Sequence, residues 1–134
     1  MAILLVERAP IASSEDVIRV RQLVRDCVVK LGFSLVEQTK MVTAASELAR
    51  NTLEHGGGGD VTMEEVHEGI RRGLRVRFSD QGPGIPNLDQ ALKDGFTTGQ
   101  GLGLGLSGSK RLVNEFYIES KPGKGTSVTI VRWK

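Results

Sequence analysis

Ser46-Glu47-Leu48-Ala49-Arg50-Asn51 is the first of three stretches that decide the fold of this chain. The second is Asp80-Gln81-Gly82-Pro83-Gly84, and the third is Gly101-Leu102-Gly103-Leu104-Gly105. Each stretch is a weak signal alone. In this order they predict a nucleotide pocket, built from a carboxylate and an amide on one helix face, an acid before a glycine turn, and a glycine run that opens a helix.

The composition is that of one globular domain. The chain has 134 residues, of which 39% are hydrophobic and 25% charged, and this balance favours a folded core over disorder. We therefore expect a single domain over residues 1–134. The net charge of +2 is too small for nucleic-acid binding to be the first expectation. Four Phe, one Tyr and one Trp are also too few for a base-stacking surface.

The chain begins with an apolar run that a charge already interrupts at Glu7. This run is too short for a signal peptide or a membrane span, so we expect a cytoplasmic protein without a membrane partner. The single cysteine, Cys27, can form no intramolecular disulfide and offers no metal cluster. It falls on the apolar stripe of a predicted helix, where we expect a small core residue.

Apolar periodicity divides the chain into helices and strands. Valines three and four residues apart predict a helix that begins at Ser13 or Ser14 and ends at Gly32. A capping box at 34–37 opens a second helix, which runs to about His55. The other expected elements are strands at 3–6, 61–68, 74–80, 116–120 and 126–133 and helices at 88–92 and 102–114. The sum predicts an α/β (α+β) two-layer sandwich: a mixed, mostly antiparallel sheet with helices on one face.

Glu47 and Asn51 lie four residues apart, so one helix face carries both side chains. An amide oxygen suits a hydrated Mg²⁺ ion, and the neighbouring carboxylate can accept the proton of an attacking hydroxyl. Taken alone, the pair is also what an ordinary solvated helix face would carry.

Asp80 ends a strand and precedes two glycines. A carboxylate can accept a hydrogen bond from an amino group such as that of adenine, although a plain turn after a strand has the same composition. The glycines of 101–105 can bring backbone N–H groups close to phosphates at a helix start, and a flexible loop is the alternative there. This run matches neither a P-loop nor a Rossmann fingerprint.

Taken together, the motifs resemble the GHKL ATP-binding (Bergerat) fold of histidine kinases, gyrase, Hsp90 and MutL. Glu47 and Asn51 match the N box, 80–84 the first glycine box and 101–105 the second. Gly125-Thr126 resembles the late Gly-Thr of the family. Within this superfamily the short chain most resembles the stand-alone anti-sigma-factor kinases of the RsbT type. The stretches nearest to that type are 46–51, 80–86, 94–96 and 110–112.

The resemblance implies a role for each matched residue. Asn51 would ligate Mg²⁺, and Glu47 would be the general base toward a substrate hydroxyl. Asp80 would bind the adenine amino group, supported by Thr126. The remaining ATP-binding positions would be Gly82 and Gly84 at the adenine wall and Gly101, Leu102, Gly103, Leu104 and Gly105 around the phosphates. Residues 95–100 would form the ATP lid.

The resemblance leaves more than one function open. The first is an ATP- and Mg²⁺-dependent serine/threonine kinase in a partner-switching pathway. It would phosphorylate an RsbS-like STAS-domain antagonist and activate an RsbU-like phosphatase or regulate a sigma factor. The second is a nucleotide-gated binding switch with little or no kinase activity, and a sigma-factor-binding inhibitor is a third. Glu47 favours the kinase, because a pure binding protein needs no base there.

Overall fold

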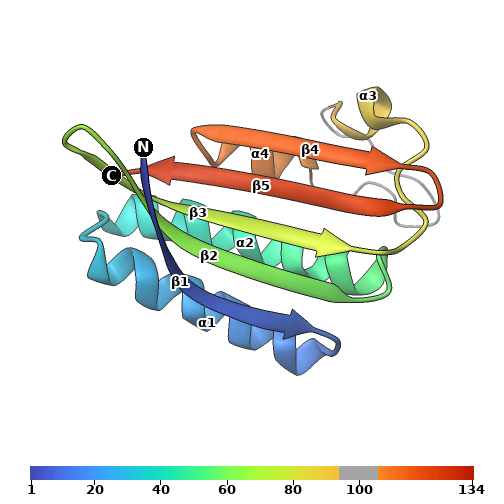
Figure 1. Cartoon of the computed structure of the whole chain (residues 1–134), viewed down its shortest axis with the longest axis horizontal. Helices are drawn as coiled ribbons and strands as arrows, with labels where there is room; N and C mark the ends of the chain where they lie inside the picture. Colours follow the sequence, from blue (N-terminus) through green and yellow to red (C-terminus); the bar gives the residue numbers. More distant parts are fainter. Residues whose placement is uncertain (94–105) are drawn as a thin grey trace.

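The computed structural model describes residues 1–93 and 106–134 of the chain. Figure 1 shows a twisted sheet with helices α1 and α2 lying along one of its faces. The elements in chain order are β1 (Ala2–Ile11), α1 (Ser14–Lys30), α2 (Leu35–Glu54), β2 (Gly59–Glu68), β3 (Arg71–Asp80), α3 (Leu88–Ala91), α4 (Leu106–Arg111), β4 (Glu115–Lys121) and β5 (Gly125–Trp133). The predicted two-layer sandwich is confirmed.

The strands follow the order β1-β2-β3-β5-β4 across the sheet. Each of the four strand pairs within the described residues is antiparallel, so the sheet has no parallel pair there. Strand β3 occupies the centre, and its Leu74, Val76 and Phe78 are buried under the helices, as their alternation predicts. Arg75, Arg77 and Ser79 project from the opposite face, which no described helix covers.

Local capping bonds fix where the two long helices begin. The Ser13 hydroxyl accepts from the Asp16 N–H and opens α1, whose Val20, Val24 and Val28 are buried. In α2, Ser34 and Glu37 form the predicted capping box, with bonds of 3.0 and 3.2 Å. Cys27 packs against the core as a half-buried residue, and this burial raises the pKa of its thiol.

Three elements differ from the sequence prediction by three or more residues at one end. Strand β1 continues through Pro10 to Ile11, because an edge strand tolerates a residue without an N–H. The hairpin between β2 and β3 turns over only two residues, with Gly69 at φ 61°. Helix α4 ends at Arg111 and not at Asn114, whose N–H instead donates to the Val131 carbonyl of the sheet at 2.9 Å. The start of the helix expected over 102–114 lies outside the described residues.

Candidate nucleotide-binding site

Asp80 lies at the last position of β3 and is only 9% exposed. Its Oδ1 accepts two backbone N–H bonds, from Gly82 at 2.9 Å and from Thr126 at 3.2 Å. No hydrogen bond from the rest of the described chain reaches Oδ2. The fold therefore holds this carboxylate in place by one oxygen and leaves the other able to accept a hydrogen bond.

Glycine packing brings the end of α2 directly against this acid. A Cβ on Gly56 would lie 2.4 Å from Asp80 Cγ, and one on Gly82 would lie 2.7 Å from the Gly56 backbone. Both separations are far inside van der Waals contact. Glycine at 56 and 82 is therefore required by the approach of the protein's own segments.

We call the segments around Asp80 (the end of α2, the first glycine box at 80–84 and the β4–β5 turn) the wall. A histidine connects the end of α2 to the first glycine box. His55, the C-cap residue of α2, lies with Nε2 3.1 Å from the Gly84 carbonyl oxygen, so the tautomer with a proton on Nε2 would donate this bond. Gly84 itself has φ 77°, and a Cβ there would lie 2.3 Å from the Lys121 carbonyl oxygen. The first glycine box is thus held between α2 and the β4–β5 turn.

The structure places the backbone N–H of Thr126, and not its hydroxyl, against Asp80. The Thr126 hydroxyl lies 2.8 Å from Ser120 Oγ, which also accepts from the Ile85 N–H at 2.7 Å. Ser120 and Gly56 are thus residues of the wall that sequence reasoning missed. His55 is the helix-end residue that the sequence predicts, and its contact with Gly84 is the part that was not predicted. The run of four glycines at 56–59 was the one available signal, since it marks a close backbone approach.

Asn51 shares a narrow cavity of about 20 Å³ with Asp80 and Thr126. The other lining residues are Leu48, Thr52, His55, Phe78, Ile85, Leu106 and Val128. This space holds roughly one water molecule. The structure thus brings three of the predicted site residues together at the ends of α2, β3 and the start of β5.

Glu47 lies one helical turn before Asn51 and outside the lining of that cavity. Its side chain is 42% exposed and forms an ion pair of 2.8 Å with Arg50. The predicted phosphate residues Gly101, Leu102, Gly103, Leu104 and Gly105 and the predicted lid at 95–100 lie outside the described residues. Leu106, which follows them directly, lines the cavity.

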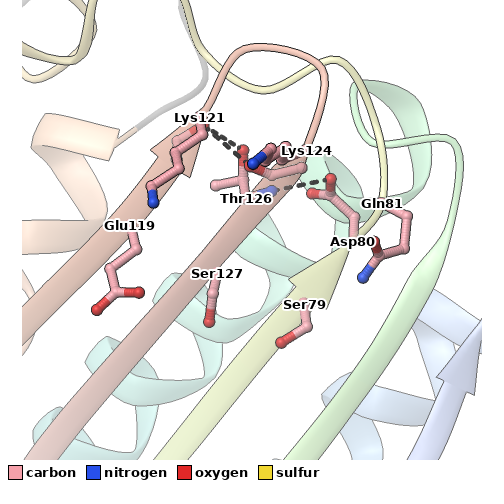
Figure 2. Close-up of a pocket in the computed structure, with 10 residues that line it drawn as sticks. Ser79, Asp80, Gln81, Glu119, Lys121, Lys124, Thr126 and Ser127 are labelled. Carbon is pink, nitrogen blue, oxygen red and sulfur yellow. Dashed lines mark hydrogen bonds between the residues drawn. The ribbon is translucent and has the colours of Figure 1, made fainter.

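A second cavity, of about 310 Å³, lies against Asp80 and Thr126 as well. Figure 2 shows its polar side chains, with Ser79, Ser127 and Glu119 on the sheet face turned away from α2. Lys121 and Lys124 stand at its upper end, on the β4–β5 turn. Asp80 and Thr126 therefore separate a narrow cavity on the helix side from a wide polar cavity on the other side.

The chain belongs to the histidine kinase-, DNA gyrase B- and HSP90-like ATPase family, whose model matches residues 36–134. Within that family it is a serine/threonine kinase of the RsbT type. It is 43% identical over 118 residues to the serine/threonine-protein kinase RsbT of Bacillus subtilis, covering 88% of this chain and 89% of that protein. The anti-sigma F factor of Geobacillus thermodenitrificans is 34% identical over 125 residues, covering 87% and 84%.

Solved structures share the fold at lower identity. The RsbU and RsbW domains of a Mycobacterium tuberculosis protein match with a TM-score of 0.62 and 20% identity over 100% of this chain, which spans 33% of that longer chain. The catalytic domain of histidine kinase ThkA matches with a TM-score of 0.51 and 18% identity over 95% of both chains. Among residues 1–93 and 106–134, no helix has the length and apolarity needed to cross a membrane.

Proposed function

We propose that this chain, acting as one domain over residues 1–134, transfers the γ-phosphoryl group of ATP to a hydroxyl of an RsbS-like STAS-domain antagonist. The observation that carries the proposal is Asp80, a carboxylate that is 9% exposed and fixed through Oδ1 while Oδ2 stays available. In the proposed complex, Oδ2 accepts a hydrogen bond from the adenine amino group. Gly82 and Gly84 shape the wall, and the backbone N–H of Thr126 holds the acid in place.

The cavity next to Asp80 must widen to admit a purine. Its present volume of about 20 Å³ is far below the roughly 300 Å³ at which ligand pockets usually begin. Ile85 and Leu106 line the cavity and belong to neither α2 nor the sheet. A separation of these two side chains would open the space without disturbing the bonds that hold Asp80.

Asn51 fits the metal that the family uses. An amide oxygen is a hard ligand, and Mg²⁺ keeps several waters and takes few protein groups. Asn51 would therefore hold the ion together with the nucleotide phosphates. When bound, Mg²⁺ neutralises phosphate charge, which is most of what phosphoryl transfer requires besides positioning.

Glu47 is the proposed general base toward the hydroxyl of the protein substrate. One helical turn separates it from Asn51, and its partial exposure leaves it open to a partner's side chain. Its carboxylate is paired with Arg50 at 2.8 Å.

Gly101, Gly103 and Gly105 would bind the phosphates through their backbone N–H groups, with Leu102 and Leu104 between them. We also propose a cytoplasmic location and an output through an RsbU-like phosphatase or a sigma factor.

The experiment that tests the proposal is transfer of label from γ-labelled ATP with Mg²⁺ to the STAS-domain protein of the same organism. A positioned base contributes about 10²- to 10⁴-fold, so Glu47→Gln should lose transfer by that factor and keep its nucleotide affinity. Glu54→Gln, an exposed carboxylate further along α2, is the matched control. Transfer that survives Glu47→Gln would refute the role of this residue. Nucleotide-dependent complex formation without any transfer would favour the binding switch instead.

A further inference from the structure

The face of the sheet away from the helices carries a groove that the proposed catalytic site does not use. The 310 Å³ cavity behind Asp80 and a second cavity of about 380 Å³ share Glu119 in their linings. Between them, the register pairs Ser79 with Ser127, Arg77 with Thr129 and Arg75 with Val131. Since side chains on one sheet face recur at every second residue, these pairs form one continuous floor. We call this surface the open-face groove.

Among the exposed side chains of the open-face groove, unpaired cations outnumber unpaired carboxylates. The side chains of Arg77, Lys121 and Lys124 are exposed and form neither a hydrogen bond nor an ion pair with any other described residue. Arg75 is already paired with Glu64 at 2.9 Å. Glu119 is the exposed carboxylate of the lining without such a partner in the described chain. Asp80 is buried and Glu115 half-buried, and both accept hydrogen bonds from neutral donors. The groove therefore favours an acidic occupant.

One end of the open-face groove is apolar. Val66 and Val131 are 0% and 4% exposed although they lie on the face without helices. Trp133 and Tyr117 line the same cavity, and both donate to the Glu115 carboxylate, at 2.6 and 2.8 Å. These bonds satisfy Glu115. Arg71 lies over the Trp133 ring, 4.0 Å from its centroid, so the two valines and the exposed Tyr117 ring supply the apolar surface of this end. An occupant would place an apolar side chain here and its carboxylates toward the lysines.

The cationic end of the groove is bonded to the wall that holds Asp80. The Gly123 N–H of the β4–β5 turn donates to the Pro83 carbonyl at 2.7 Å, and Ser120 Oγ accepts from the Ile85 N–H. Lys121 and Lys124 lie on the same turn. A partner that displaces this turn when it binds would therefore also displace the first glycine box.

We propose that the open-face groove docks an acidic segment of a partner protein that also carries a large apolar side chain, and that this docking is coupled to nucleotide binding through the β4–β5 turn. The coupling rests on the proposed function, whereas the docking does not. Coupling between two sites is reciprocal, so ATP must change the affinity for the segment by the factor by which the segment changes the affinity for ATP.

The test is an NMR titration of the ¹⁵N-labelled protein with a short peptide of glutamates around one central leucine, and with its lysine counterpart. We expect the acidic peptide alone to shift the amides of Ser79, Ser127 and Thr129, with an affinity that falls as salt is added. Lys121→Gln/Lys124→Gln should weaken binding roughly three- to thirtyfold, since each exposed charge contact contributes a few tenths to about 1 kcal/mol. The control is Arg21→Gln/Arg25→Gln, which makes the same charge change on the exposed side of α1. Its affinity for the acidic peptide should stay within about twofold of that of the unaltered protein.

Several outcomes would overturn the docking. These are no shift with the acidic peptide, equal shifts with the lysine peptide, or shifts outside the open-face groove. Amide shifts that depend on protein concentration without peptide would assign the face to a second copy of the chain. Docking that is indifferent to ATP would remove the coupling alone. Docking that persists in a protein without phosphotransfer would count against the proposed function and leave the docking intact.

Discussion

Gly56→Ala is the sharpest perturbation of the proposed adenine wall. The new Cβ would lie 2.4 Å from Asp80 Cγ and 2.5 Å from Oδ2, whereas carbon atoms pack at about 3.5–4.0 Å. Either the carboxylate or the end of α2 must therefore move by roughly 1 Å. Gly56 does not have a positive φ, so the alanine introduces no backbone strain and the effect is one of contact alone.

The expected loss follows from the bond that Asp80 would make. A hydrogen bond to a charged group contributes about 1.5–3 kcal/mol, so displacing the carboxylate should weaken ATP binding about ten- to hundredfold. Overpacking should also lower the free energy of unfolding by about 1–3 kcal/mol. Competition with a fluorescent nucleotide measures the affinity, and thermal unfolding followed by circular dichroism measures the stability.

Gly69→Ala is the control that separates affinity from stability. Gly69 has φ 61° in the β2–β3 turn, so alanine there costs about 1–2 kcal/mol of strain. The turn lies at the far end of two ten-residue strands, roughly 30 Å from Asp80. The Gly69→Ala variant should therefore lose stability and keep its nucleotide affinity. The reasoning is refuted if Gly56→Ala binds ATP within about twofold of the unaltered protein.

Three further predictions concern separate features. Asn51→Ala should weaken Mg²⁺-dependent ATP binding at least about tenfold and leave Mg²⁺-free binding nearly unchanged, as titration calorimetry with and without the metal would show. Ser34→Ala should lower the free energy of unfolding by about 0.5–2 kcal/mol through loss of the capping box of α2, measured by urea denaturation. The pKa of Glu115 is held below its ordinary value of 4.5 by bonds from Trp133 and Tyr117. This stabilisation is present above pH 4.5 and is lost as the pH falls through the lowered pKa. The fluorescence emission of the single Trp should therefore change as the pH falls through the lowered pKa of Glu115 in the native protein. The Glu115→Gln variant should show no such change.

The sequence was most informative where the cause of a structure is local. The capping box at Ser34 and the alternation of Leu74, Val76 and Phe78 are confirmed, because neighbouring residues alone determine them. The limits of β1 and α4 were less predictable. Pro10 is acceptable only because β1 lies at an edge, and Asn114 leaves the helical pattern because Val131 offers it a carbonyl.

The candidate site was predictable as a set of residues and not as a set of contacts. Asp80 and Thr126 are 46 positions apart, and only the family resemblance connects them. Thr126 contacts Asp80 through its backbone N–H because its hydroxyl is hydrogen-bonded to Ser120. The packing of Gly56 on Asp80 depends on how far the end of α2 overlies β3. No periodicity in the sequence contains that information.

The edge strand β1 has a consequence for handling the protein. Ile3, Leu4, Leu5 and Val6 are 44–57% exposed and carry no charge. The irregularity after Leu5 and the proline at position 10 interrupt only the second half of the strand. An uncharged, exposed edge is a template for pairing with other chains. Concentrated samples should therefore assemble from the N-terminus, and a lysine in place of Leu4 should keep them monodisperse in light scattering.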